Sequence, residues 1–222
     1  MSENSPINYL SPDVPEALPW HSVPLVKATN ESLKGYGQLV DDYQSFELEI
    51  VIWPAQGWRP VDAGTGNEGG TTYGNFDFWW EGDVLYGKNQ AVGDQYLLGW
   101  SKNPADVQTD NPTPDRFQVL LWHANYHPDG GQLFFPLDGG AFVAPLALPG
   151  DDVTPDKFVA FYVEGGKGLY IHPNVWHEGV FPLTERASFY DEQGKVHARI
   201  SCNIAQEFGV FLSIPLPQDG LK

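Results

Sequence analysis

The chain has 222 residues, of which 24 are glycine, 19 are proline and 14% are aromatic. No long stretch lacks both helix breakers, so the composition excludes a helical bundle and favours many short strands joined by turns. The formal net charge of −17, from 29 acidic and 12 basic residues, repels phosphate backbones and anionic lipids, so neither nucleic acid nor membrane partners are expected.

The N-terminal segment, residues 1–24, contains five prolines and predicts an extended arm. It has no basic region followed by an apolar stretch, and the chain has no run near the roughly 20 apolar residues of a membrane span. These features predict a cytoplasmic protein. The single cysteine, Cys202, excludes an internal disulfide and a cysteine-based zinc site, and its strand-like surroundings predict a buried side chain.

The first half of the remaining chain predicts strands separated by loops. Residues 46–53 alternate and then become continuously apolar, as in a core strand. The glycine-rich residues 63–75 lack the ending of a phosphate-binding loop, so they predict a plain loop. Residues 76–87 predict a hairpin that turns near residues 81–83, and residues 95–100 predict a further strand.

This region also carries four large aromatic side chains, Trp79, Trp80, Tyr86 and Trp100. We expect them to pack in the core, and a stacking platform for a sugar ring is the alternative. The polar, proline-rich residues 101–115 predict a loop.

Further strands are expected in the second half. Residues 117–127 and 132–148 predict successive strands, with a tight Asp-Gly turn at residues 137–140. Residues 186–204 predict two strands joined by a turn at Gln193–Gly194. The whole pattern predicts one all-β domain over residues 25–222, with an additional aromatic and glycine-rich segment at about 57–117.

One short helix is expected among these strands. Thr154 followed by Pro155 is typical of a helix start, so we predict a helix over residues 156–163. The glycines in residues 164–168 would end it.

Histidines cluster in the second half of the chain, while His21 lies in the arm. The other five fall within the last hundred residues, at His123, His127, His172, His177 and His197. A hydrogen-bonded core position is the simpler interpretation for His123 and His197. The pair His172 and His177 favours a site.

Two short motifs in this region resemble those that hold a divalent metal in the cupin family. Asn125, His127, Gln132 and Gly139 have the spacing of the first motif, and residues 174–177 match the second, with His177 as its distal ligand. The resemblance implies a cupin-type double-stranded β-helix, or jelly roll, with a few short helices. The implied metal ligands are His127, Gln132, His172 and His177.

The chemistry of this ligand set departs from the family pattern. Asparagine stands in place of the first histidine, and glutamine replaces the carboxylate. The set is therefore neutral and would hold a late first-row ion such as Ni, Zn or Mn only weakly. No nucleotide or organic cofactor is expected.

A closer resemblance covers about sixty residues from His127 to Val180. This stretch is similar to the ureidoglycolate lyases, small cupins that act in purine and allantoin catabolism. The matching positions are His127, Pro128, Gln132, Phe134, Pro136, Leu137, Gly168, His172, Val175, Trp176 and His177. The resemblance implies a homodimer that cleaves ureidoglycolate to glyoxylate and urea and uses a divalent ion.

The resemblance also implies roles for residues. His172 and His177 would handle protons or metal, because an imidazole near its usual pKa suits both proton steps of the cleavage. His127 and Gln132 would orient the substrate oxygens beside Phe134, and Trp176 would exclude water.

Two positions differ from the family pattern. In the family, an arginine often follows the histidine that corresponds to His172, but this chain has Pro173 there. An anionic substrate therefore needs another cation, for which Lys167, Arg186 and Arg199 are candidates. Glu178 replaces a second histidine and could act as a metal ligand, act as an acid or base, or cap the turn.

Two other functions stay open. An altered histidine cluster also fits another metal-dependent cupin enzyme, such as a sugar isomerase or a dioxygenase. The tryptophans also fit a non-catalytic jelly roll that binds a carbohydrate.

Overall fold

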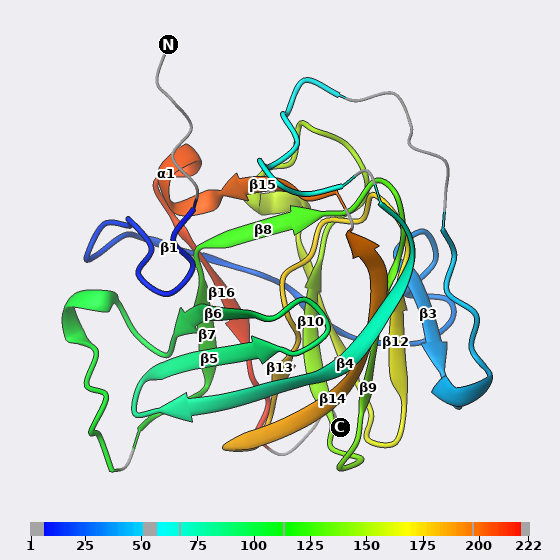
Figure 1. The fold of residues 1–222 in the computed structure, drawn as a ribbon. Helices are drawn as coiled ribbons and strands as arrows, with labels where there is room; N and C mark the ends of the chain where they lie inside the picture. The colour runs from blue at the N-terminus through cyan, green and yellow to red at the C-terminus, as the bar shows by residue number, and fades with distance from the viewer. Residues whose placement is uncertain (1–6, 51–56, 67, 113, 197, 219–222) are drawn as a thin grey trace.

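The computed structural model describes residues 7–50, 57–66, 68–112, 114–196 and 198–218. Their regular structure is almost entirely β, as predicted, and forms three sheets (Figure 1). The largest sheet has the strand order β1 (Trp20–Ser22), β16 (Phe211–Pro215), β7 (Gln118–Leu121), β6 (Asp94–Trp100), β5 (Val84–Asn89), β4 (Glu68–Glu81), β14 (Arg186–Val196), β9 (Gln132–Pro136), β12 (Gly168–Ile171) and β3 (Gly37–Val40).

The other elements are shorter. The second sheet has the order β13 (Phe181–Pro182), β10 (Phe142–Leu146), β11 (Val159–Val163) and β2 (Leu25–Lys27), and the third pairs β15 (Ile200–Asn203) with β8 (His123–Tyr126). The helical elements are the single turns η1 (Tyr43–Ser45), η2 (Pro104–Asp106) and η3 (Pro155–Lys157) and the α-helix α1 (Ile204–Phe208).

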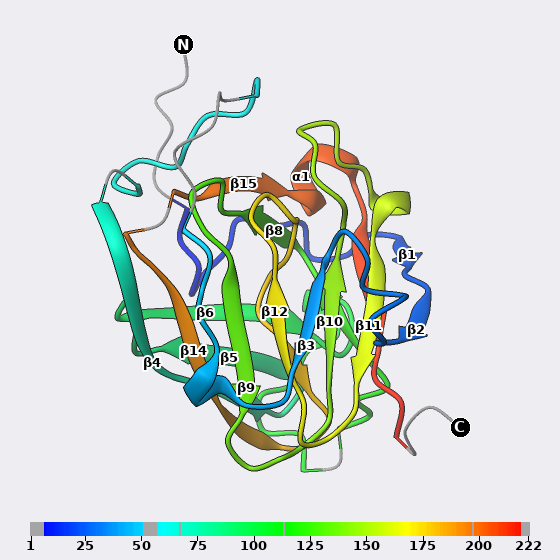
Figure 2. The ribbon, with the colours of Figure 1, turned by 90° about the vertical axis from the view of Figure 1, so that its right-hand side faces the viewer.

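The two larger sheets enclose one core, as in a jelly roll of the cupin type. Apolar side chains of β4, β9 and β12 meet those of β10 and β11 in a single buried cluster that includes Phe78, Phe134, Leu169, Phe142 and Phe161. Figure 2 shows β10 and β11 on the side of the molecule away from β4. In both views β8, β15 and α1 lie at one end of the barrel.

The N-terminal segment is paired with both sheets. β1 runs parallel to β16, and β2 runs parallel to β11. Before them, the ring of Tyr9 packs edge-on against Tyr96 and His123, with centre distances of 5.5 and 5.3 Å. From residue 7 onward, the arm is therefore part of the barrel wall.

Most of the strand predictions are confirmed, but the predicted loop over residues 63–75 is wrong for residues 68–75, which belong to β4. The hairpin between β4 and β5 turns at Gly82, whose φ of 54° lies in the left-handed region. Gly139 also has a positive φ, of 72°, at the predicted Asp-Gly turn. That turn does not form a hairpin, however, because β9 and β10 belong to different sheets.

The predicted core strand over residues 46–53 is wrong for its described part, and residues 51–53 lie outside the described residues. Residues 46–49 form no strand, and Ile50 makes only an isolated bridge to Gly130. The apolar side chains instead cover the outer face of the sheet, where Phe46 packs on Tyr170 with ring centres 4.9 Å apart. The alternating apolar pattern of this segment therefore reflects packing on the outer face of the sheet.

The predicted helix over residues 156–163 is also wrong. One 3-10 turn, η3, follows Thr154, whose side chain makes no capping bond. The rest is β11, which is hydrogen-bonded on one side to β10 and on the other to β2. Two flanking strands satisfy its backbone, and its β-branched and aromatic residues fit a sheet better than a helix.

No turn forms at Gln193–Gly194. β14 continues to Val196 and stays paired with β4, with a register shift only between Gly194 and Val196. Gly194 therefore marks an irregularity in a long strand. Because β14 continues through this position, Gln193 lies inside the barrel.

Cys202 is buried, as expected, and burial raises the pKa of its thiol to about 12. Among the described residues, no helix has the length and apolar character needed to cross a membrane.

Candidate active site

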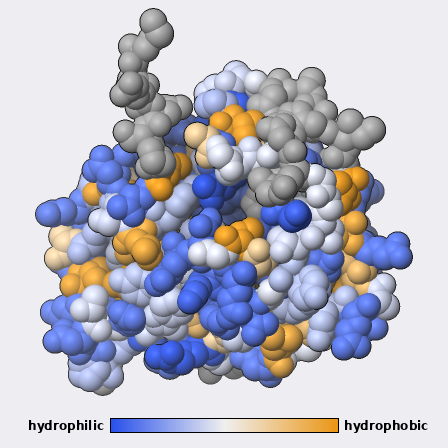
Figure 3. Space-filling model, in the orientation of Figure 1, coloured by the Kyte–Doolittle hydropathy of each residue, from blue (hydrophilic) through white to orange (hydrophobic). Residues whose placement is uncertain are grey.

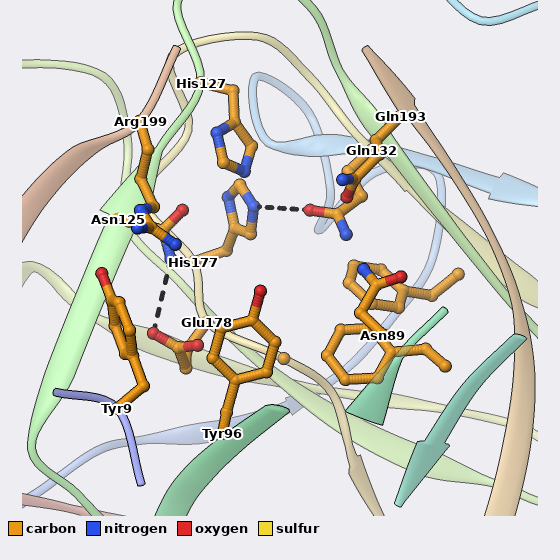
Figure 4. Close-up of a pocket in the computed structure, with 13 residues that line it drawn as sticks. Tyr9, Asn89, Tyr96, Asn125, His127, Gln132, His177, Glu178, Gln193 and Arg199 are labelled. Carbon is orange, nitrogen blue, oxygen red and sulfur yellow. Dashed lines mark hydrogen bonds between the residues drawn. The ribbon is translucent and has the colours of Figure 1, made fainter. Parts of the chain in front are cut away.

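A small cavity of about 40 Å³ lies inside the barrel beside β8. Its aromatic walls are Tyr9, Phe76, Tyr96 and Phe134. Its polar walls carry four amides, two imidazoles, a carboxylate and a guanidinium, which belong to Asn89, Asn125, Gln132, Gln193, His127, His177, Glu178 and Arg199 (Figure 4). The face shown in Figure 3 is hollowed near its centre, where the visible atoms are mostly hydrophilic.

Backbone pairing brings His177 to this cavity. After β12 the chain turns through Asn174, whose φ of 67° is left-handed and whose N–H donates to the carbonyl of His127 at 2.9 Å. His177 and Asn125 then exchange two backbone hydrogen bonds of 2.8 Å. The loop after β12 is thereby fastened to β8.

The hydrogen bonds of His177 determine where its protons lie. Nδ1 is 2.8 Å from the carbonyl oxygen of Val175, which can only accept, so Nδ1 carries a proton. Burial lowers the pKa of His177, which favours the neutral ring. A neutral ring protonated at Nδ1 keeps its lone pair on Nε2, so His177 is suited to accept a proton there.

Gln132 connects His177 to a buried carboxyl group. Its amide oxygen is 3.1 Å from His177 Nε2, and its amide nitrogen donates to Asp191 at 2.7 Å. Asn89 donates to the other oxygen of Asp191 at 3.0 Å. Burial raises the pKa of Asp191 to about 7.

This chain of groups allows a second arrangement of the amide. A protonated Asp191 can donate to the amide oxygen of Gln132, and the amide nitrogen can then donate to the lone pair of His177. The first arrangement fits a His177 that is protonated on both ring nitrogens, and the second fits the neutral ring, so Gln132 can stay between the two titrating groups in either state.

Glu178 forms a close pair with His123. Its Oε2 is 2.6 Å from His123 Nδ1 and 3.4 Å from Asn125 Nδ2, and both side chains are buried. No described residue donates to Oε1. One carboxylate oxygen is therefore held while the other stays available at the cavity wall.

Arg199 supplies the positive charge of the cavity. Its Nε donates to Asp62 at 2.9 Å, and its guanidinium lies 4.6 Å from the ring centre of Tyr9. No described residue accepts a bond from its terminal nitrogens. Tyr96 and Arg199 also line a second, larger cavity of about 380 Å³, so these two residues lie between the inner cavity and the outer one.

Two amides of the cavity have unpaired polar atoms. The side-chain nitrogen of Gln193 and the side-chain oxygen of Asn125 are buried, and neither has a hydrogen-bond partner among the described residues. Buried polar atoms are rarely left unpaired in proteins. Among the described residues, one donor and one acceptor are therefore left available to a ligand that offers the complementary groups.

The described residues are a poor fit to a resident divalent ion. His127 and His177 have the right type of donor, and Nδ1 of each is hydrogen-bonded to a backbone carbonyl. Their neighbours Gln132 and Asn125 are neutral amides, and the described residues hold no group of three His, Cys, Asp or Glu side chains placed to bind a metal.

The structure brings together most of the residues expected at the site. Those that line the cavity are His127, Gln132, Phe134, His177, Glu178 and Arg199. His172 and Trp176 do not line it. Of the other candidate cations, Lys167 pairs with Asp41 at the surface, and Arg186 lines a separate open depression with Asp77 and Trp79.

The expectation that His172 faces His177 is wrong because of strand alternation. Ile171 points into the core, so its neighbour His172 points to the other face of the sheet. There its ring packs edge-on against Tyr170, with centres 5.4 Å apart.

The expectation that Trp176 walls the site is wrong for a similar reason. Its indole is completely buried on the side of the chain opposite His177, where Nε1 donates to the carbonyl of Gly150 at 2.8 Å. It packs against Tyr126, with ring centres 4.7 Å apart. Trp176 is a core residue.

Several cavity residues were not expected from the sequence, namely Tyr9, Phe76, Asn89, Tyr96, Gly179 and Gln193. The only sequence signal for Asn89 and Gln193 is an amide within an otherwise strand-like run. The aromatic group upstream is mainly structural, because Trp80 and Trp100 are buried and Trp79 stacks on Tyr86.

Comparison with known proteins gives the same family as the sequence resemblance. Residues 101–204 match the family model described as Ureidoglycolate lyase. This part of the chain is related to the ureidoglycolate lyase family. Similar curated proteins are the ureidoglycolate lyases of Escherichia coli O139:H28 (strain E24377A / ETEC), 31% identical, and of Salmonella paratyphi B (strain ATCC BAA-1250 / SPB7), 32% identical, each over 75 residues.

The alignment to these ureidoglycolate lyases is partial. It covers 34% of this chain and 47% of each relative, so the chain spans about half the length of the curated relatives it matches. The family match includes His127, Gln132, His177, Glu178 and Arg199, whereas Tyr9, Asn89 and Tyr96 lie outside it.

Proposed function

We propose that this protein cleaves the carbon–nitrogen bond of ureidoglycolate, or of a closely related ureido-hydroxy acid, to give glyoxylate and urea. The observation that carries the proposal is the placement of His177, whose Nδ1 is bonded to the carbonyl of Val175 and whose ring lines a cavity that also holds Arg199. The relationship of residues 101–204 to the ureidoglycolate lyases supports the same reaction.

The chemistry follows from the groups around the cavity. The substrate carries a hydroxyl and a ureido nitrogen on one carbon, beside a carboxylate. Nε2 of His177 accepts the hydroxyl proton, the carbonyl of glyoxylate forms, and the carbon–nitrogen bond breaks. The imidazolium then returns the proton to the departing nitrogen, so urea leaves neutral and His177 is restored.

Charge complementarity orients the substrate. The terminal nitrogens of Arg199, which bond to no described residue, suit the substrate carboxylate, because a guanidinium and a carboxylate can form paired hydrogen bonds. Glu178 favours the protonated form of His177, so its negative charge stabilises the imidazolium that forms during the reaction. Oε1 of Glu178 accepts an N–H of the ureido group.

The unpaired amide atoms suit the rest of the ureido group. The side-chain nitrogen of Gln193 and the side-chain oxygen of Asn125 have no partner in the described part of the chain. The nitrogen can donate to the ureido carbonyl, and the oxygen can accept from a ureido N–H. A cavity of about 40 Å³ accepts only a compact molecule, so the carboxylate would lie toward Arg199 and the outer cavity. The homodimer implied by the family resemblance is part of the same proposal.

Turnover of ureidoglycolate by the purified protein tests the proposal. Glyoxylate and urea are measured together, for the wild-type protein and for the His177→Gln variant. We expect equal amounts of both products from the wild type and almost none above the uncatalysed rate from the variant. Absence of both products with the folded wild-type protein would refute the proposed reaction.

A further inference from the structure

His123 lies behind the cavity wall and makes one hydrogen bond that bears on the site. Its ring is 1% exposed and is packed between Tyr9 and Trp122, with ring centres 5.3 and 5.0 Å away. Nδ1 is 2.6 Å from Oε2 of Glu178. Nε2 is buried and has no partner among the described residues.

These contacts fix the rotation of the Glu178 side chain. The ring of His123 cannot turn away, because aromatic neighbours enclose it, so its Nδ1 holds Oε2 in one place. Asn125 adds a weaker contact of 3.4 Å to the same oxygen. Oε1 is thereby left without a donor among the described residues, at the wall of the cavity that His177 also lines (Figure 4).

The energetics argue against a purely structural pair. Burying a carboxylate and an imidazole costs desolvation free energy that their attraction barely offsets, so such pairs contribute little to net stability. Here one member of the pair lines the cavity and the other supports it from behind. This arrangement is typical of a residue that orients a functional carboxylate.

We propose that His123 is a positioning residue that holds Glu178 in the orientation needed for the reaction. The inference rests on the proposed function, because it assigns Glu178 a place beside the substrate. His123 itself touches neither the substrate nor His177, and it acts only through Oε2 of Glu178.

A spectroscopic measurement tests the pair without reference to any reaction. A short hydrogen bond to a carboxylate moves the imidazole Nδ1 proton far downfield in the proton NMR spectrum. We expect one such signal from ¹⁵N-histidine-labelled wild-type protein, its retention in His21→Asn, and its loss in Glu178→Gln and His123→Asn. A wild-type spectrum without the signal would overturn the pairing even if the enzyme is active.

Kinetics then test the positioning role in the active protein. His123→Leu should lower kcat about 10- to 100-fold and leave KM within about threefold, because the substrate contacts of Arg199 remain. His123→Asn, whose side-chain nitrogen can donate in place of Nδ1, should recover most of kcat. The control His21→Asn should match the wild type.

A double variant separates positioning from damage to the fold. In the Glu178→Gln background, His123→Leu should cause no further loss of kcat, because there is no carboxylate left to orient. Independent, multiplying losses, or an Asn variant as poor as the Leu variant, would overturn the inference. An inactive wild type that still shows the downfield signal would refute the proposed reaction while leaving the pair intact.

Discussion

The imidazole rings of His127 and His177 meet edge to face, with their centres 5.0 Å apart. His127 directly follows β8, and His177 lies in the loop after β12, so the contact depends on the pairing of that loop with β8. Nδ1 of each ring is hydrogen-bonded to a backbone carbonyl. Both rings are therefore fixed by the backbone before any ligand enters.

We expect replacement of His177 and replacement of His172 to have different effects on kcat. His177→Gln should lower kcat by about 10²- to 10⁴-fold, which is the usual contribution of a general base. His172→Gln should keep kcat within about threefold, because His172 points to the outer face of the sheet against Tyr170. Steady-state kinetics of both variants check this, and equal losses would contradict the placement of His172.

Arg199 should govern binding of the anionic substrate. Arg199→Gln removes the charge that faces the carboxylate, so KM should rise about 10- to 100-fold, the range expected for a charge-assisted contact. Arg186→Gln is the matched control, because Arg186 lies in a different depression. The measurement is KM for both variants, together with thermal melting to verify folding. An unchanged KM for Arg199→Gln would contradict this role.

Asp191 should make stability depend on pH. Its pKa in the folded protein is about 7, against an ordinary value of 3.8, so the folded state holds the proton more tightly than the unfolded state. Its stabilising contribution is complete below about pH 4 and is lost as pH rises to about 7, and the difference is on the order of 4 kcal/mol.

The matched variant for this effect is Asp191→Asn, which cannot titrate. Urea unfolding of both proteins across this pH range gives the difference between their free energies of unfolding. We expect that difference to shift against the wild type as pH rises through this window. A difference independent of pH would mean that the pKa of Asp191 is the same in the folded and unfolded states.

Trp176 should affect stability and not substrate binding. Trp176→Phe removes the Nε1 bond to Gly150 and leaves a small cavity, which should lower the free energy of unfolding by about 1–3 kcal/mol. KM of the folded variant should stay within about twofold of the wild type. Chemical unfolding and kinetics of the same preparation check both points, and a large rise in KM would return Trp176 to the cavity wall.

Much of the fold follows from local sequence patterns, and the wrong predictions arise where pairing between distant strands outweighs the local signal. The turn at Gly82 and the strands around it were predictable because turn residues separate short alternating runs. Gln193–Gly194 looked equally turn-like, but there the long pairing of β14 with β4 outweighs the local signal. β11 likewise owes its strand conformation to its two neighbours.

The site was only partly predictable, because its parts come from distant segments. The spacing of His127, Gln132 and His177 could be matched to a family pattern. Gln193 faces the cavity because of the strand register, which pairs it directly with Gln132 where β14 lies beside β9. Tyr9 reaches the cavity through tertiary packing of the arm, for which the sequence carries no local signal.

The most direct test of the account is a crystal structure of the protein with oxalurate, the keto analogue of ureidoglycolate, which lacks the hydroxyl proton and cannot be cleaved by this route. The account predicts that the carboxylate of the analogue binds Arg199, that its keto oxygen takes the place of the substrate hydroxyl beside His177, and that its ureido group contacts Asn125 and Gln193. Binding of the analogue away from His177, or an empty cavity at saturating analogue, would contradict it.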